Sequence, residues 1–271
     1  MKSFRLTRLI LPMLILGLLL PVISAATQNN IEEAPQIILK NAVWTWSDQL
    51  DGQQSIFISR YTGDDWEEPV KISSNENLNV VPSITRTAAG NLWVVWSTIG
   101  GGHSSLVYKR LVGGVWTEET SYYTGLNSNT APSIGIDSAG KVWLAWAGFD
   151  GISDEIFYST WDGSSFAPAI PLTSNSIPDI LPVLGFNDKD NTVWIQWKQF
   201  KKSGYIVYQT IETESDWSTP APIEETESVR KDEAQIEITL PPFITNPASA
   251  SLHIPGHAVQ SLPVRDMDVI Q

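Results

Sequence analysis

The chain has 271 residues, with 30 acidic residues against 17 basic ones and a formal net charge of −13. A surface this acidic repels phosphate backbones, so no nucleic-acid partner is expected. Cysteine is absent, which excludes disulfides and thiolate metal sites and leaves the burial of apolar side chains to stabilise the core.

The first 26 residues have the three-part order of a secretory signal peptide. The basic segment contains three charged residues, Lys2, Arg5 and Arg8. An almost wholly apolar run follows over 9–23, and small residues at 24–26 offer a cleavage site. An uncleaved anchor is the alternative, but Pro12 and Pro21 interrupt the run. We expect residues 1–26 to be removed and the mature protein, with no membrane span, to be secreted or extracytoplasmic, in the periplasm or at the cell surface.

A repeat of about 50 residues runs through residues 27–240. One tryptophan recurs at spacings of 50, 50 and 51, as Trp46, Trp96, Trp146 and Trp197. A second aromatic position keeps the same spacing, as Trp66, Trp116, Phe166 and Trp217. A proline recurs in the same way, as Pro82, Pro132 and Pro182. A period in this range, with several short β-type runs in each unit, indicates a repeat array or a propeller.

The third unit, residues 131–180, illustrates what one repeat contains. Four short β-type runs are separated by turn residues, at 132–136, 142–146, 155–159 and 166–172. Helical periodicity is absent from the whole sequence, and four short antiparallel strands in each unit are typical of a propeller blade. We therefore predict an all-β fold, a β-propeller built from four-stranded blades.

The second run of each unit is apolar on both faces, as in Trp143-Leu144-Ala145-Trp146. A strand with one wet face would instead alternate apolar and polar residues. Blades that pack face to face bury such a strand on both sides, so nearly every tryptophan is expected in the core. Trp161 is the exception, because it lies off the repeat. We expect it to be exposed beside a hairpin turn, where it is a candidate ligand contact.

The pattern leaves the number of blades open. Four clear units begin near Ala34, Val81, Ala131 and Leu181. After Trp217 the pattern resumes once, at 234–238, and residues 241–271 are either a degenerate fifth blade or a tail with weak strand patterns such as 249–254. Folded proteins normally cover an open sheet edge. A terminal strand, or a second copy of the chain in a homo-oligomer, could therefore complete the ring.

The turn between the third and fourth runs is Ser159-Thr160-Trp161-Asp162-Gly163-Ser164-Ser165-Phe166. It resembles the Asp-box, Ser-x-Asp-x-Gly-x-Thr-Trp, of the sialidase-like (BNR-repeat) propellers, and the resemblance covers about residues 34–240. All four copies depart from the box at its third position, which is occupied by Tyr61, Leu111, Trp161 and Glu212. Glycine supplies the positive φ of a tight hairpin, so the resemblance implies a fold and a structural turn more than an activity.

A sialidase needs three arginines that bind a carboxylate, a paired Tyr and Glu, and an Asp acid/base. The mature chain has five arginines and lacks the early Arg-Ile-Pro motif of that family, so we assign no catalytic residue. The three histidines form no metal-binding motif, and we predict no metal site and no cofactor. A paired-carboxylate glycosidase is an alternative, with four carboxylates to inspect: Glu76, Asp150, Asp154 and Asp179.

The resemblance places two sets of loops on the face opposite the Asp-box turns: the loops between second and third runs, and the connections between units. The first set diverges between units, and variable loops on a constant framework commonly carry specificity. We predict ligand contacts at Asp150, Asp154, Asn127 and Asn175, in addition to Trp161. Oxygen ligands from Asp150 and Asp154 could also help to hold calcium.

The sequence favours a secreted, non-catalytic β-propeller whose partner is a glycan or an extracellular protein. An extracellular glycoside hydrolase or polysaccharide lyase of sialidase-like fold is the alternative, and a purely structural surface protein is the third possibility. Convergence of acidic side chains within hydrogen-bond reach of one another would favour an enzyme.

Overall fold

The computed structural model describes residues 42–187, 190–202, 204–223 and 249–253. Within these ranges every regular element is a β-strand, which confirms the all-β prediction. No helix in the described part of the chain is long and apolar enough to cross a bilayer. The predicted signal peptide, the pattern at 234–238 and most of residues 241–271 lie outside the described residues.

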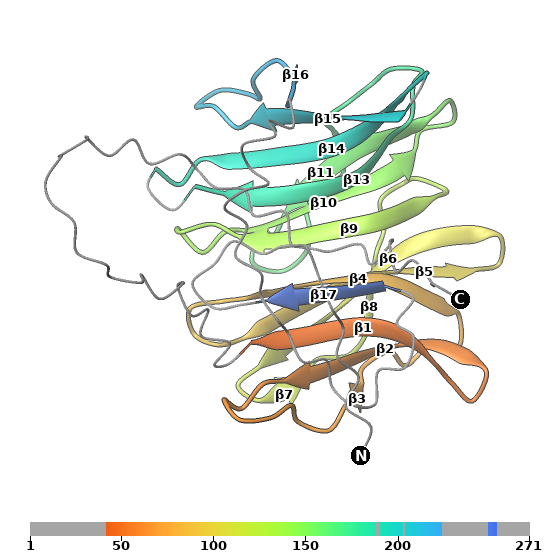
Figure 1. The fold of residues 1–271 in the computed structure, drawn as a ribbon, viewed down its shortest axis with the longest axis vertical. Helices are drawn as coiled ribbons and strands as arrows, with labels where there is room; N and C mark the ends of the chain where they lie inside the picture. The colour runs from red at the N-terminus through yellow and green to blue at the C-terminus, as the bar shows by residue number, and fades with distance from the viewer. Residues whose placement is uncertain (1–41, 188–189, 203, 224–248, 254–271) are drawn as a thin grey trace, which may run out of the picture. The chain divides into compact units, whose positions relative to one another are not determined.

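The strands form four antiparallel sheets (Figure 1). The first contains β17 (Ser249–His253), β1 (Val43–Leu50), β2 (Gln53–Arg60) and β3 (Val70–Lys71). The second contains β4 (Leu78–Arg86), β5 (Leu92–Gly100), β6 (His103–Val112) and β7 (Val115–Trp116), with β8 (Thr120–Tyr122) also paired to β6. The third contains β9 (Asn129–Ile136), β10 (Val142–Phe149), β11 (Asp154–Thr160) and β12 (Ile170–Pro171). The fourth contains β13 (Asp179–Phe186), β14 (Val193–Lys201), β15 (Gly204–Ile211) and β16 (Ala221–Pro222).

Consecutive sheets pack face to face through three apolar clusters. Trp96 and Ile58 belong to the cluster between the first and second sheets, and Trp146 and Val95 to the one between the second and third. Trp197 contributes to the third cluster, between the third and fourth sheets. Apolar residues on both faces of the second strands are therefore buried, as predicted. None of these clusters of described residues joins the fourth sheet to the first.

A strand from far along the chain completes the first sheet. β17 pairs antiparallel with β1, with Thr45 opposite Ser251, and it lies between β1 and β4 (Figure 1). The weak pattern at 249–254 is thus a strand. It takes the first-strand position of the first unit, which the sequence had suggested would begin near Ala34. That residue lies outside the described ranges.

The first strand of three units carries the same β-bulge. Val81, Ala131 and Leu181 have φ values of 52°, 51° and 53°, and each stands before a repeat proline. The ladder to the next strand shifts register at each of these points. A positive φ is rare outside glycine, and a β-branched residue such as Val81 adopts it only where the surroundings impose it. The bulge is therefore a regular structural feature of the repeat rather than an irregularity of one strand.

The serine that follows the repeat proline ties one sheet to the next. The backbone N–H of Ile134 donates to Ser83 Oγ at 3.1 Å, and that of Leu184 donates to Ser133 Oγ at 3.0 Å. These bonds run between the first strands β4, β9 and β13. The Pro-Ser motif of the repeat thus sets the contact between neighbouring sheets.

Candidate functional site

The loops between second and third strands lie at the same end of the sheets as the connections between units; this end is here called the rim. In the third sheet the N–H of Phe149, at the end of β10, donates to the carbonyl of Ser128 in the preceding connection at 3.0 Å. The Asp-box turn lies at the other end. Thr160 pairs with Trp143 near the start of β10, and the next residue, Trp161, forms the β-bridge with Phe166 that closes the turn. The two ends therefore differ in chemistry, with variable polar loops at one and repeated turns at the other.

A buried acceptor binds the indole of the repeat tryptophan in three sheets. Trp96 Nε1 donates to Asn79, Trp146 Nε1 to Asn129 and Trp197 Nε1 to Asp179, each at 2.9 Å. Each acceptor stands three residues before a repeat proline, at the start of the bulged first strand, and is almost fully buried. The third copy differs from the other two because its acceptor is a carboxylate.

A second carboxylate lies beside Asp179. Glu155 in β11 is 1% exposed, while its repeat equivalents are Ser55 and Ser105. The side-chain nitrogen of Asn175 donates to Asp179 Oδ2 at 2.7 Å and to Glu155 Oε2 at 3.3 Å. The junction between the third and fourth sheets thus holds two buried carboxylates bridged by one amide. The equivalent positions of the two preceding junctions carry neutral residues, Ser55 with Asn79 and Ser105 with Asn129.

All four carboxylate oxygens accept hydrogen bonds from the protein. Glu155 accepts from Ser153 Oγ at 2.7 Å, Thr173 Oγ1 at 2.5 Å and the Asn175 backbone at 2.8 Å. Asp179 Oδ1 also accepts from Gln199 Nε2 at 2.8 Å. A general acid or base must come within hydrogen-bond reach of its substrate, whereas these groups are buried and already bonded. They are placed to orient their amide and hydroxyl partners.

A rim cavity of about 290 Å³ opens over this network. It is lined by Leu172, Thr173, Ser174, Asn175, Asp179, Trp197, Gln199, Tyr208 and Pro220. The Tyr208 ring stacks on Trp197 with centroids 6.0 Å apart, and Lys201 Nζ lies 5.8 Å from the Tyr208 centroid. Aromatic surface combined with a few fixed amides and hydroxyls is typical of a pocket for a small polar ligand.

Of the four ligand contacts predicted at the rim, only Asn175 lies at the cavity. Asn175 lines the cavity, whereas Asp150 and Asn127 are exposed side chains on neighbouring loops. Asp150 Oδ1 accepts from the backbone of Ser153 and Ile152, and these hydrogen bonds lower the pKa of Asp150. Asp154 is half-buried at the start of β11. Asp150 thus shapes the turn that delivers Ser153 to Glu155.

Metal binding has limited support at this end of the molecule. Among the described residues no group of three or more His, Cys, Asp or Glu side chains is arranged to hold a metal ion. Calcium at Asp150 and Asp154 therefore stays a prediction based on two carboxylates.

Trp161 lies at the opposite end from the other four candidates. Its ring packs edge-on against Trp93, with centroids 4.8 Å apart, and the Arg110 guanidinium lies 4.9 Å from its centroid. Trp161 also pairs with Phe166 as Tyr61 pairs with Trp66, so it does occupy a repeat position. The expectation of an exposed ring off the repeat is wrong, because neighbouring aromatic rings and an arginine leave Trp161 half-buried. Its role as a ligand contact stays a prediction.

Exposed apolar residues at the rim escaped the sequence analysis. Ile99, Phe149 and Phe200 each follow a repeat tryptophan by three residues, and each is exposed. Phe200 contacts Tyr205, with ring centroids 5.5 Å apart, and Tyr205 is 57% exposed. Their fixed offset from the repeat tryptophan is a signal that could have identified them. The same comparison of repeats would have singled out Glu155.

No family model matches the sequence, and no curated protein matches it. Solved structures do match. A protein of unknown function from Dyadobacter fermentans is similar with a TM-score of 0.54 and 11% identity, over 65% of this chain and 60% of that one. An α-L-arabinanase from Penicillium chrysogenum, complexed with arabinobiose, has a TM-score of 0.52 and 11% identity, over 80% of this chain and 73% of that one.

A third similar structure, a fucose lectin from Kordia zhangzhouensis, has a TM-score of only 0.39 with 14% identity, over 54% of this chain and 99% of the lectin. This likeness is too distant to bear on the fold. The chain spans less than two thirds of the length of the Dyadobacter protein. Together with the four face-to-face sheets, the arabinanase likeness defines a β-propeller-like protein. No comparison points specifically to the sialidase-like family.

Proposed function

We propose that this chain is a secreted, non-catalytic β-propeller that binds an extracellular glycan at the rim cavity between its third and fourth sheets. The observation that carries the proposal is the Glu155–Asn175–Asp179 network beneath that cavity. It departs from the repeat at two buried positions at once, and packing alone does not require either change.

The chemistry of the cavity suits a saccharide. A sugar presents hydroxyl groups at its edge and C–H groups on its faces, and the cavity offers the Gln199 amide, the Ser174 hydroxyl and the Tyr208 ring. Because buried carboxylates hold the amides of Asn175 and Gln199 in place, little side-chain freedom would be lost on binding. The arabinobiose in the similar arabinanase structure motivates arabino-oligosaccharides as a first ligand class to test.

Two finer points of the sequence interpretation stay within the proposal. We infer that residues 1–26 direct export and that residues 27–240 carry the repeat domain, with degenerate Asp-box turns of the sialidase-like type. The remainder, 241–271, supplies β17, and a second copy of the chain could complete a ring.

A glycoside hydrolase or polysaccharide lyase is the second candidate. Two carboxylates side by side at a rim cavity favour it, because most glycosidases use such a pair. The occupied oxygens of Glu155 and Asp179 argue against it, as does their burial. Release of reducing ends from arabinan or galactan by the mature chain, abolished by Glu155→Gln, would establish the enzyme instead.

The repeat itself supplies a matched test of the binding proposal. Glu155→Ser with Asp179→Asn restores the residue types of the other units and keeps an acceptor for the Trp197 indole. Titration calorimetry against arabino-oligosaccharides and a wider glycan panel should show binding by the mature chain. We expect this double variant and Gln199→Ala each to weaken that binding about tenfold, the equivalent of about one lost hydrogen bond.

The controls separate recognition from folding. Asn91→Ala removes an amide at the Asp-box end, where Asn91 Oδ1 accepts from the Gly113 backbone at 3.2 Å, and should bind normally. Asp150→Asn with Asp154→Asn should weaken binding with little change in Tm if those loops also contact the glycan. Full affinity in the Glu155/Asp179 variant and in Gln199→Ala would refute the cavity as the binding site.

A further inference from the structure

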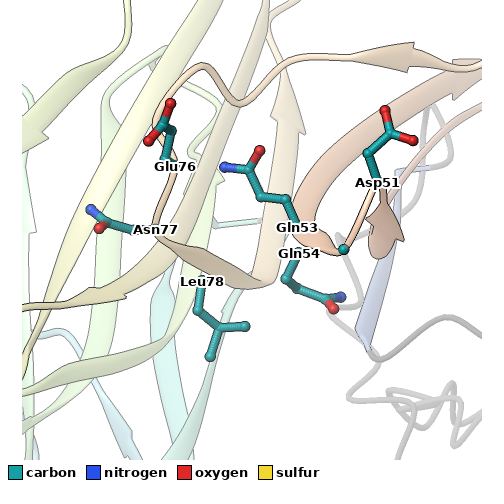
Figure 2. Close-up of a pocket in the computed structure, with 7 residues that line it drawn as sticks. Asp51, Gln53, Gln54, Glu76, Asn77 and Leu78 are labelled. Carbon is teal, nitrogen blue, oxygen red and sulfur yellow. The ribbon is translucent and has the colours of Figure 1, made fainter.

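A second cavity, of about 380 Å³, lies at the rim of the first sheet. It is lined by Asp51, Gly52, Gln53, Gln54, Glu76, Asn77 and Leu78 (Figure 2). One wall is the turn between β1 and β2, where Asp51 and Gly52 have φ values of 52° and 82°. Two consecutive positive φ values make a tight hairpin turn, which places the Asp51 carboxylate at the tip.

The opposite wall is held rigidly against the second sheet. Glu119 accepts hydrogen bonds from the backbone and hydroxyl of Ser74 and from the Asn75 side chain. Burial raises the pKa of Glu119, but the bonds from Asn75 and Ser74 outweigh burial and leave it below its ordinary value. Asn75 Oδ1 in turn accepts from the Asn77 backbone at 2.9 Å. The segment that carries Glu76 is therefore fixed before any ligand arrives.

The two glutamine side chains of this cavity are anchored through their nitrogens. Gln53 Nε2 donates to the Asn75 carbonyl at 2.8 Å, and Gln54 Nε2 donates to Ser47 Oγ at 2.6 Å. Among the described residues, no donor bonds to the amide oxygen of Gln53, so this oxygen can accept a hydrogen bond from a ligand. Figure 2 shows the Gln54 amide and the Leu78 side chain pointing away from the side on which the head groups of Glu76, Gln53 and Asp51 lie. That side is rich in acceptor oxygens, and none of the seven lining residues carries a positive charge.

We propose that this second cavity binds an amino sugar through its ammonium group, as in a glucosamine unit. The two carboxylates and the Gln53 amide oxygen complement an ammonium flanked by hydroxyl donors, and the 46% exposed side chain of Leu78 adds an apolar group at the opposite edge of the cavity. The volume suits a small ligand. The inference rests on the proposed function only in taking the ligand to be a glycan, because no residue is shared between the two cavities.

The test compares three soluble probes by titration calorimetry and amide NMR on the mature chain. A glucosamine trimer carries ammonium groups and sugar rings, its N-acetylated counterpart carries rings alone, and spermidine carries ammonium groups alone. We expect the glucosamine trimer to bind at least about tenfold more tightly than either of the others and to perturb the amides of Gly52 and Leu78. Because exposed charges are screened, that affinity should fall with added salt.

Asp51→Asn with Glu76→Gln is the decisive variant, since it removes both charges and keeps the shape. It should lower affinity for the glucosamine trimer at least about tenfold. Glu67→Gln with Glu68→Gln makes the same change in net charge at exposed positions by the Asp-box turn of this unit, and should bind like the unchanged chain. Equal loss in both variants would indicate attraction by bulk charge and would overturn the proposal.

Two further outcomes separate this proposal from the first. Tight binding of spermidine, equal to that of the trimer, would overturn the amino-sugar assignment. If the glucosamine trimer binds at residues 51–54 and 76–78 while neutral oligosaccharides bind nowhere, the first proposal fails and this one stands. If neutral oligosaccharides bind at Gln199 and the trimer perturbs nothing near Gly52, the reverse holds.

Discussion

At the scale of single residues, the fold depends on buried hydrogen bonds made by aromatic side chains. Three of the four repeat tryptophans, Trp96, Trp146 and Trp197, bury their rings between sheets and need a partner for the indole N–H. The bulged first strand supplies that partner from Asn79, Asn129 or Asp179. The same contact therefore buries the indole ring and satisfies its N–H group. A substitution of the tryptophan or of its acceptor disturbs both contributions.

Truncation of a repeat tryptophan should be costly. Trp146 is fully buried and donates to Asn129, so Trp146→Ala opens a cavity and leaves a buried acceptor unsatisfied. We expect a loss of about 3–5 kcal/mol in the free energy of unfolding. Trp161→Ala removes a half-buried ring and should cost about 1–2 kcal/mol, more than an exposed ring would. Urea denaturation measures both, and equal midpoints would contradict the placement of these rings.

The Asp-box turn should make one pH-dependent contribution to stability. Backbone N–H groups of Ser165 and Ser164 hold the pKa of Asp162 at about 2, below its ordinary 3.8. Because the folded state lowers this pKa, the contribution is complete above about pH 4 and is lost as the pH falls toward 2. The Tm difference between the unchanged chain and Asp162→Ala should therefore be constant near neutrality and shrink over that window.

A neighbouring repeat provides the control for this turn. Thr62 occupies the equivalent position, and its hydroxyl accepts from the Asp65 backbone at 3.3 Å. Asp162→Thr should keep much of the stability that Asp162→Ala loses, and this remainder should not titrate. A Tm difference for Asp162→Ala that persists unchanged at pH 2 would show that the carboxylate charge does not support the turn.

The burial of a side chain could be predicted from the sequence only where its residue type recurs in the repeat. Trp146 recurs at fixed spacing, and its burial followed from the pattern. Trp161 is replaced by Tyr, Leu or Glu in the other units, so periodicity could not show that Arg110 and Trp93 would cover it. Glu155 was missed because it is one of 30 acidic residues. Only alignment with Ser55 and Ser105 shows that a carboxylate replaces a serine at this repeat position.

At the scale of elements, β17 is the part with the most distant partner in sequence. Its residues Ala250-Ser251-Leu252 align in register with the repeated Pro-Ser-Ile run, since Ser251 faces Thr45 as Ser133 faces Ala145. The sequence indicated a weak strand there. It also allowed that a terminal strand completes the ring. It could not indicate that this strand would pair with β1, because pairing across the chain depends on the approach of the first and second sheets rather than on local propensity.

Two truncations test whether β17 completes the first sheet. A chain that stops after residue 248 lacks β17 and exposes the edge of β1, so we expect a lower unfolding midpoint and aggregation through that edge. A chain that stops after residue 253 keeps the strand and should retain most of the stability. Thermal unfolding with light scattering distinguishes them, and identical behaviour of the two chains would show that the pairing contributes little.

At the scale of the whole molecule, the sequence predicted the all-β class and the repeated sheets because large apolar residues recur with a period of about 50 residues. The binding face is harder to predict, since polar loop residues favour turns whatever their function. Asn175 became a strong candidate only when Asp179 and Glu155 were found on either side of its amide.

Export is the property of the whole chain that most needs a direct measurement. The order of basic, apolar and small residues predicts cleavage near Ala26, so the mature chain should begin at Ala26 or Thr27. N-terminal sequencing of protein from the native host checks this. Recovery of intact Met1 from the cell surface would indicate an uncleaved anchor instead.

The pairing of β1 with β17 has a consequence for how the molecule is made. β1 is among the first described strands to leave the ribosome and β17 is the last, so the first sheet stays incomplete until almost the whole chain has been translated. Contacts this distant in sequence also slow folding. Nascent chains would therefore carry an unpaired β1 edge throughout synthesis. That delay keeps the chain open to any machinery that handles unfolded polypeptides, and makes premature termination more harmful than the loss of a few residues would suggest.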